Sequence, residues 1–387
     1  MTRYSAFVSG AELSCDVAIL GGGLSGCLIA LALAQKRPML DVRIVEASAQ
    51  LGGNHIWSFF EGDIAAEHRW LVEPLICHRW AGYDVIFPKY KRTLESAYFA
   101  IESERLEAVV REKLPEDHIL CGTVKATEKG LVLLEDGRTI AAGTVIDARG
   151  PGDLSTLTLG WQKFVGISLH ITGGHGLSRP VVMDATVAQE DGYRFFYCLP
   201  FDAETLFIED TYYSDTPQLD ASKIREGIIA FAAAKGWKTN GGGREETGVL
   251  PVVIRGDFEA YWRSTGSSIA KAGLRAGLFH ATTGYSLPSA VRLAMAYAQD
   301  PKIDVYAYAT AQWRKGSFYR LLDTMLFHAA EPNLRYKIFE RFYRLSPSLI
   351  SRFYAGQSTL ADKLRLLSGR PPVSVMRALK AVLRFRR

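Results

Sequence analysis

The chain has 387 residues, of which 48% are hydrophobic, and a formal net charge of +5 at pH 7. This length suffices for two or three domains, and the composition is that of a globular protein. The five scattered cysteines include no Cys-x-x-Cys pair and residues 1–15 are mixed in character, which argues against a zinc site and a signal peptide and favours a reducing, cytoplasmic location.

The charge is distributed unevenly along the chain. From Gln312 to the end there are 16 Lys/Arg and 4 Asp/Glu, which leaves 30 Lys/Arg and 37 Asp/Glu in the rest. The tail therefore carries +12 and the body −7. A basic, aromatic tail on an acidic body predicts an anionic partner surface, for which membrane phospholipid and nucleic acid are the two candidates.

An apolar segment followed by closely spaced glycines occupies residues 16–26. Gly21, Gly23 and Gly26 have the G-x-G-x-x-G spacing of dinucleotide-binding loops. In such loops the first glycine allows a tight turn after a strand, the second lets backbone amides approach a pyrophosphate, and the third lets the helix lie against the strand. The helix N-terminus then favours the phosphate charge. We therefore predict a strand, a turn and a helix that bind phosphate.

A second apolar strand, predicted at residues 42–46, ends in Glu46, an acid suited to ribose hydroxyls. Together with the glycine loop, it predicts an adenine dinucleotide site. The alternative is a membrane span, because residues 17–35 hold no charge and have nearly the required length. Three consecutive glycines favour the phosphate loop.

Gly52 and Gly53 follow the second strand and allow the backbone to run close to a ligand. An acid-ended strand followed by Gly-Gly resembles FAD-binding proteins of the two-dinucleotide-binding class, which favours FAD over NAD. His55 either faces the flavin or is a buried histidine whose hydrogen bonds are made within the core. Arg105 resembles an arginine that contacts FAD in aromatic hydroxylases, and a plain surface arginine is an equal alternative.

The middle of the chain is rich in strand-forming residues. Residues 144–150 predict a buried strand that ends at a glycine, and the Pro-Gly pair after it marks a domain crossing. Residues 160–215 contain consecutive strands with short links, which predicts an antiparallel sheet. The aromatic residues at 193–201 exceed what a sheet core requires, so we expect an apolar ligand to lie across it.

Two adjacent acids, Glu209 and Asp210, lie within an apolar predicted strand at residues 206–213. Strand alternation places Phe207, Glu209 and Thr211 on one face and Asp210 on the other. A carboxyl in an apolar site has a raised pKa and can act as a general acid near neutral pH. The alternatives are an edge strand with both acids solvated, or an ion pair of one acid with Arg194.

Two further segments contribute to the predicted site. Glu245 and Glu246 precede a strand, either as catalytic support or as a surface pair with Arg244. A glycine-rich turn at residues 275–288, containing Gly284, opens a helix and resembles the third FAD contact of hydroxylases. Phe-His replaces the usual Gly-Asp in that turn.

The C-terminal region is predicted to be helical, with apolar stripes flanked by arginines. We interpret the first stripe, at residues 334–345, as a helical cap that packs on the body. The second, at residues 375–383, is compatible either with packing or with lying in a membrane interface. A helix of residues 219–236 is predicted to be structural.

Four motifs occur in one order along the chain. They are the glycine loop, Gly-Gly-Asn-His-x-Trp-Ser-Phe at 52–59, Phe-Ile-Glu-Asp-Thr at 207–211 and His-Ala-Thr-Thr-Gly-Tyr at 280–285. This combination resembles the bacterial lycopene cyclase family, and the resemblance extends into the tail at 341–343 and 352–356. Plant relatives carry Glu-Glu-Thr at the third motif, so Asp210 departs from that variant.

The resemblance implies a proton-initiated cyclisation of the acyclic ends of lycopene to β-ionone rings, by way of γ-carotene, without net redox change. Glu209 matches the catalytic glutamate of the family, with Asp210 tuning or orienting it. The family uses reduced FAD, with NAD(P)H as electron donor. The substrate implies a membrane lipid surface as partner, and other enzymes of carotenoid biosynthesis are possible partners. Nucleic acid is not expected, and neither is a metal.

The implied architecture is an α/β flavoprotein with a Rossmann-type, hydroxylase-like FAD-binding domain. We assign residues 1–60, 96–155 and 268–310 to that domain, 61–95 and 156–267 to an antiparallel-sheet substrate domain, and 311–387 to a basic helical region. The expected location is peripheral, on the cytoplasmic face of the cell membrane. The rival functions are a flavin monooxygenase or desaturase acting on an apolar isoprenoid, and a non-enzymatic binding protein.

Overall fold

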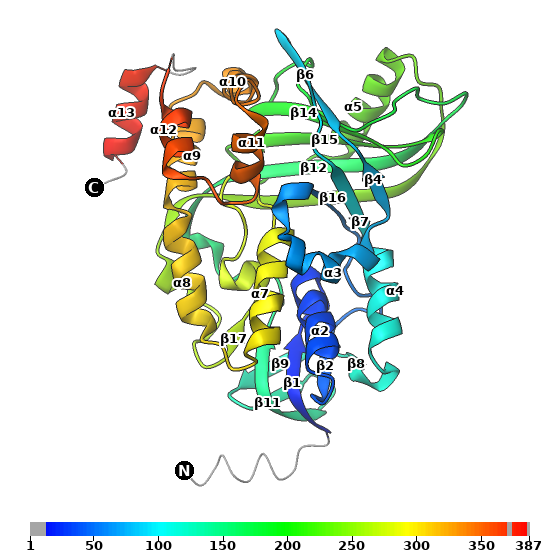
Figure 1. Cartoon of the computed structure of the whole chain (residues 1–387), viewed down its shortest axis with the longest axis vertical. Coiled ribbons are helices and arrows are strands. Elements are labelled where there is room, and N and C mark those ends of the chain that lie inside the picture. Colours follow the sequence, from blue (N-terminus) through cyan, green and yellow to red (C-terminus); the bar gives the residue numbers. More distant parts are fainter. Residues whose placement is uncertain (1–12, 370–373, 385–387) are drawn as a thin grey trace.

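The structure is a computed structural model that describes residues 13–369 and 374–384. A nucleotide sheet and a substrate sheet, each of seven strands, lie one above the other, with helices beside both (Figure 1). The strand order of the nucleotide sheet is β8 (Ile119–Cys121), β2 (Val42–Glu46), β1 (Leu13–Leu20), β11 (Thr139–Asp147), β10 (Leu131–Leu134) and β9 (Val124–Glu128). The first four strands are parallel, the last two pair antiparallel, and β17 (Ala270–Lys271) joins β11.

The predicted strand–turn–helix is confirmed, because β1 ends at Leu20 and α2 (Leu24–Lys36) begins four residues later. The membrane-span interpretation of residues 17–35 is therefore wrong. Helix α2 packs against α7 (Leu287–Gln299) and α4 (Ser103–Lys113) in one apolar core. Within the described residues, no helix has the length and apolarity needed to cross a bilayer.

The substrate sheet has the strand order β16 (Thr239–Gly256), β12 (Leu157–Ile171), β15 (Thr205–Ser214), β14 (Tyr193–Pro200), β13 (Val181–Asp184), β5 (Tyr83–Phe87) and β6 (Tyr90–Leu94). All its pairs are antiparallel except β13 with β5, which confirms the predicted antiparallel sheet. Strand β15 lies between β12 and β14. The edge-strand interpretation of residues 206–213 is therefore wrong.

The two faces of the substrate sheet have different coverings. Helix α5 (Ala221–Ala234) packs on one face against Phe196 and Ile208, and so confirms the predicted structural helix. The opposite face carries Phe207 and Tyr213 and packs against the C-terminal helices. Because successive residues alternate between faces, Glu209 belongs to the face of the C-terminal helices and Asp210 to the α5 face.

A small third sheet lies between the two large ones. It consists of β3 (Ile56–Phe60), β7 (Tyr98–Glu102) and β4 (His78–Trp80), and α3 (Arg69–Val72) precedes β4. The predicted domain boundaries near residues 60 and 96 fall at the strands of this connecting sheet. The division of the chain into domains stays a prediction.

The rest of the chain is mainly helical. After α6 (Phe258–Arg263) and α7 come α8 (Val305–Lys315), α9 (Ser317–His328), α10 (Tyr336–Phe342), α11 (Pro347–Tyr354), α12 (Leu360–Leu367) and α13 (Val375–Arg384) (Figure 1). Phe342 and Leu345 are buried against the substrate sheet, which confirms the interpretation of the first stripe as a cap.

Candidate active site

A cavity of about 650 Å³ extends from the carboxyl end of β1 to the substrate sheet. Its lining combines residues that are far apart in the sequence. At one end are the glycine loop and the turns after β2 and β11, and at the other are Tyr197, Glu209 and Glu246. Ligands of open α/β sheets bind at the carboxyl ends of the strands, so this cavity is the candidate active site.

The glycine loop has the geometry that a pyrophosphate requires. Gly21 has φ +103°, and a Cβ there would lie 2.9 Å from the carbonyl oxygen of Ala148. A Cβ on Gly26 would collide with the backbone of Gly21, so this glycine allows the helix to lie against the loop. A Cβ on Gly23 would meet no protein atom within 4 Å, although Gly23 lines the cavity. The open space beside Gly23 fits a phosphate group.

Four of the other predicted cofactor residues line the same cavity. Glu46 lines the cavity, and its carboxylate accepts hydrogen bonds from the amides of Gly22 (2.7 Å) and Ser48 (3.1 Å). Gly52, Gly53 and Gly284 also line it, with φ values of +76°, +67° and +68°.

Arg105 does not line the cavity. Its Nε donates to the carbonyl oxygen of Pro74 at 2.8 Å, on the exposed side of α4. This placement corresponds to the surface-arginine alternative, and a contact with FAD stays a prediction.

Strand register aligns two acidic residues of the cavity, Glu209 and Glu246. Gly166 on β12 pairs with Glu209 on β15 and with Glu246 on β16, and Glu209 pairs in turn with Tyr197 on β14. Residues directly opposite one another point to the same face. The four therefore form one row across the sheet, and Phe207 lies where a side chain on Gly166 would be.

Glu209 lies in a largely apolar part of the cavity. Burial raises its pKa from 4.5 to about 8, and the charges of Glu246 and then Asp210 add to the increase. The Thr211 hydroxyl donates to Glu209 Oε1 at 2.5 Å and opposes the increase only in part. The Glu209 carboxyl is therefore mainly protonated at neutral pH, as a general acid must be.

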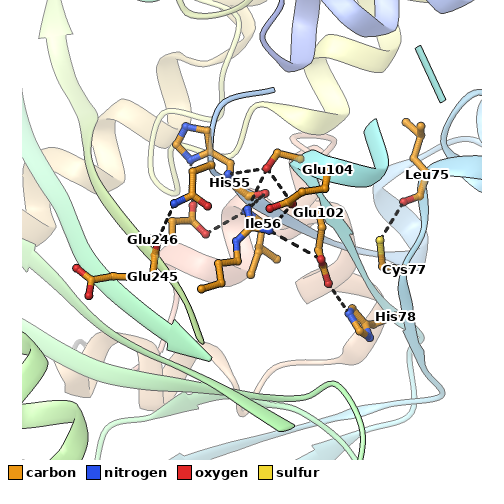
Figure 2. A network of polar contacts seen from close by, with 12 residues as sticks. His55, Ile56, Leu75, Cys77, His78, Glu102, Glu104, Glu245 and Glu246 are labelled. Carbon is orange, nitrogen blue, oxygen red and sulfur yellow. Dashed lines mark hydrogen bonds and ion pairs between the residues drawn. The ribbon is translucent and has the colours of Figure 1, made fainter. Parts of the chain in front are cut away.

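Glu246 is buried and held at both oxygens (Figure 2). Its Oε1 lies 3.0 Å from Nδ1 of His55, and its Oε2 accepts from the amide of Ile56 at 3.0 Å. His55 lines the cavity and its side chain is 47% exposed, so it is not a core histidine. Glu245 points elsewhere and pairs with Arg225, whereas Arg244 pairs with Glu104. The alternative of a surface pair with Arg244 is therefore wrong, and both acids lie within β16 rather than before a strand.

Asp210 lies on the opposite face of β15 and does not line the cavity. Arg194 donates to both carboxylate oxygens, with the shortest distance 2.7 Å, and the Tyr212 hydroxyl donates at 3.0 Å. The Arg194 alternative is thus confirmed for this acid. Burial raises the Asp210 pKa although Arg194 opposes it. Any effect of Asp210 on Glu209 acts across the sheet, and its catalytic role stays a prediction.

Sequence reasoning gave no role to Tyr285 and Gln162, which both line the cavity. The Tyr285 hydroxyl lies 2.9 Å from that of Tyr197, and its neighbour Gly284 was the available signal. Gln162 is buried in the lining, and its Oε1 has no hydrogen-bond partner within the described part of the chain. No sequence pattern distinguishes Gln162 from other polar residues of β12.

The arrangement of sheets and helices, together with the glycine loop, is that of proteins with the FAD-dependent monooxygenase and reductase fold. A geranylgeranyl bacteriochlorophyll reductase-like protein of Thermoplasma acidophilum superposes with a TM-score of 0.61 at 12% identity and covers 96% of this chain and 99% of its own. A probable FAD-dependent monooxygenase of Pseudomonas aeruginosa gives 0.56 at 16% identity, covering 81% and 96%. At these identities the likeness concerns the fold.

Residues 16–380 match the family model described as lycopene cyclase protein, and the chain belongs to this family of enzymes. Relatives named lycopene beta-cyclase include those of Pseudescherichia vulneris, 43% identical over 95% of this chain and 97% of theirs, and Pantoea ananas, 41% identical over 95% and 98%. A chloroplastic lycopene beta cyclase of Arabidopsis thaliana is 24% identical over 70% of this chain and 56% of its own.

Proposed function

We propose that the protein is a lycopene β-cyclase that converts lycopene to γ-carotene and then β-carotene by proton-initiated, non-redox isomerisation. The observation that carries the proposal is the Glu209 carboxyl, uncharged at neutral pH in an aromatic-lined cavity beside a dinucleotide loop. Relatives that cover nearly the whole chain and bear this name support the substrate.

In the proposed mechanism Glu209 transfers its proton to the terminal double bond of the acyclic end, which creates a tertiary carbocation. The neighbouring double bond attacks that cation and closes the six-membered ring. Glu246, oriented by His55 and the Ile56 amide, accepts the proton that the ring cation loses. One proton enters and one leaves, so the product is an isomer. The faces of Tyr197 and Phe207, both in the lining, stabilise the cations.

The cofactor in this proposal is FAD, with NAD(P)H as the electron donor that keeps it reduced. Gly21, Gly23 and the amides that open α2 would hold the pyrophosphate, and Glu46, which lines the same cavity, would accept hydrogen bonds from ribose hydroxyls. Reduced FAD supplies negative charge that stabilises cationic transition states. Its ring system would lie toward Gly52, Gly53 and Gly284, where the backbone leaves room.

Replacement of Gly23 by alanine is expected to weaken FAD binding at least tenfold and to leave the fold intact. The new Cβ meets no protein atom but enters the space assigned to the pyrophosphate. Gly242→Ala is the matched control, because its Cβ has ordinary contacts outside the cavity. Titration with FAD and thermal unfolding measure the two effects. Equal FAD affinity in Gly23→Ala and the control contradicts this placement of the phosphates.

The reaction is tested with lycopene in liposomes in D₂O, under anaerobic conditions and with chemically reduced FAD. We expect a cyclic product that carries one deuterium per ring without consumption of reductant. The rival function, a flavin monooxygenase or desaturase, is favoured instead if the polyene reacts only when oxygen or another electron acceptor is admitted.

We further propose that α12 and α13 dock on the cytoplasmic face of an anionic membrane. Their exposed apolar side chains include Leu360 (74%), Leu364 (62%), Met376 (63%) and Leu383 (60%). The basic side chains of Arg365, Arg377 and Lys380 on the same helices are also exposed. Apolar residues flanked by basic ones suit an interfacial helix. The proposal explains how a protein reaches a substrate that is dissolved in the bilayer.

The double substitution Leu364→Glu/Met376→Glu is expected to lower cosedimentation with phosphatidylglycerol vesicles at least fivefold, because it replaces two apolar contacts by charges of the same sign as the lipid. Ile229→Glu on α5, also exposed (42%), is the matched control. If the double variant and the control bind vesicles equally well, α12 and α13 are not the docking helices.

A further inference from the structure

A second cavity of about 390 Å³ lies on the same face of the substrate sheet as the candidate active site. Its floor is formed by β14 and β15, and its walls come from α9, α10, α11, α12 and α13. Most of the lining is leucine, phenylalanine, tyrosine and methionine, so the cavity suits an apolar ligand.

The two cavities share a wall. Tyr197 and Tyr285 belong to both linings, and their hydroxyls are hydrogen-bonded at 2.9 Å. On β15, Phe207 and Glu209 line the first cavity and Tyr213, on the same face, lines the second. Burial raises the pKa of both Tyr197 and Tyr285 well above the usual range, so the partition carries no charge.

The far end of the second cavity reaches the protein surface at α12 and α13. Leu367 and Leu379 line the cavity and are 49% and 52% exposed. Ala378 and Val382 of α13 complete this wall. Helix α13 packs against α9 at the edge of the molecule away from α5 (Figure 1). The opening of the cavity therefore coincides with the helices that carry the exposed apolar side chains.

Among the described residues, the ionisable side chains of this lining other than tyrosines are Asp323 and Arg341. Asp323 is fully buried. Burial raises the pKa of its carboxyl well above the usual range, and the Thr282 hydroxyl and the charge of Arg320 oppose this increase only in part. Burial therefore favours the uncharged form of this carboxyl. Arg341 donates to the carbonyl oxygen of Ser368, at the C-terminal end of α12.

We propose that the second cavity binds the part of the polyene that extends beyond the active site, and that substrate enters through it from the mouth between α12 and α13. This inference rests on the proposed cyclase function. Tyr197 and Tyr285 act as the gate between the cavities. The acyclic end passes this pair to reach Glu209, while the remaining chain stays in the apolar cavity and at its mouth.

Ala378→Trp tests the inference, because it fills the wall of the second cavity from a half-buried position on α13. Ile229→Trp is the matched control, since Ile229 lies on the helix α5, is 42% exposed and is outside the lining of both cavities. Each full-length variant, loaded with FAD, is assayed in detergent with lycopene and with a short acyclic isoprenoid that has the same end group. Bound lycopene is also measured after gel filtration.

We expect Ala378→Trp to lose at least tenfold in kcat/KM and in bound lycopene, and less than twofold with the short substrate. The control should match the wild type. Unchanged turnover and binding of lycopene overturn the inference, and so does an equal loss with both substrates. A wild type that binds lycopene but cyclises neither substrate overturns the proposed function, and loss of that binding in Ala378→Trp still supports the second cavity.

Discussion

Glu209→Gln is expected to lower kcat for ring closure by roughly 10²–10⁴-fold, the usual contribution of a general acid, while FAD stays bound. Glutamine keeps the size of the side chain and can still accept the Thr211 hydroxyl hydrogen bond, but it has no acidic proton to give. Nothing else on this row of the sheet replaces the acid, because the other carboxyl, Glu246, is engaged by His55 and the Ile56 amide. Anaerobic single-turnover assays with reduced FAD measure the loss.

Two comparison variants distinguish the loss of a proton donor from a structural effect of the substitution. Glu245→Gln removes a carboxylate next to Glu246 in sequence, but that side chain pairs with Arg225 outside the cavity and should leave kcat within twofold. Glu209→Asp retains an acid on a shorter side chain and should keep part of the activity. If Glu209→Gln retains full activity with FAD bound, Glu209 is not the acid and the mechanism proposed here fails.

Local patterns were sufficient to predict much of the fold. The strand, turn and helix around Gly21 follow from an apolar run interrupted by glycines, and the structure places the break there. Alternation along β15 separates Glu209 from Asp210, and the apolar periodicity of residues 219–236 gives α5. These patterns are local because backbone geometry alone sets their periods of 2.0 and 3.6 residues.

Pairing between segments that are distant in the sequence could not be predicted from local patterns. The row that joins Glu209 to Glu246 depends on both residues being opposite Gly166, which only the register of three strands defines. Arg225 was not recognised as the partner of Glu245 for the same reason, since α5 and β16 meet through tertiary packing. The edge-strand alternative for residues 206–213 stayed open because the neighbours of this strand, β12 and β14, are not apparent from its own residues.

The rate of ring closure is expected to fall about tenfold per pH unit above pH 8, because only the protonated Glu209 donates and burial raises its pKa to about 8. The negative charge of Glu246 contributes to this pKa. Glu246→Gln should therefore move the descending limb of the profile to lower pH by about one unit, the effect of one nearby charge. Glu245→Gln should leave the limb in place.

The pH at which the rate falls and the maximal rate below that pH report two different roles of Glu246. If Glu246 is also the final base, its replacement lowers kcat at every pH, whereas its charge effect on Glu209 only shifts the limb. Because the folded-state pKa of Glu209 is raised, the stability that its protonated form provides is fully present below its unfolded-state pKa and lost as the pH rises through about 8. Thermal unfolding and FAD retention must therefore be measured at each pH. A limb at the same pH in Glu246→Gln and the wild type, with both proteins folded, contradicts the coupling of the two carboxyls.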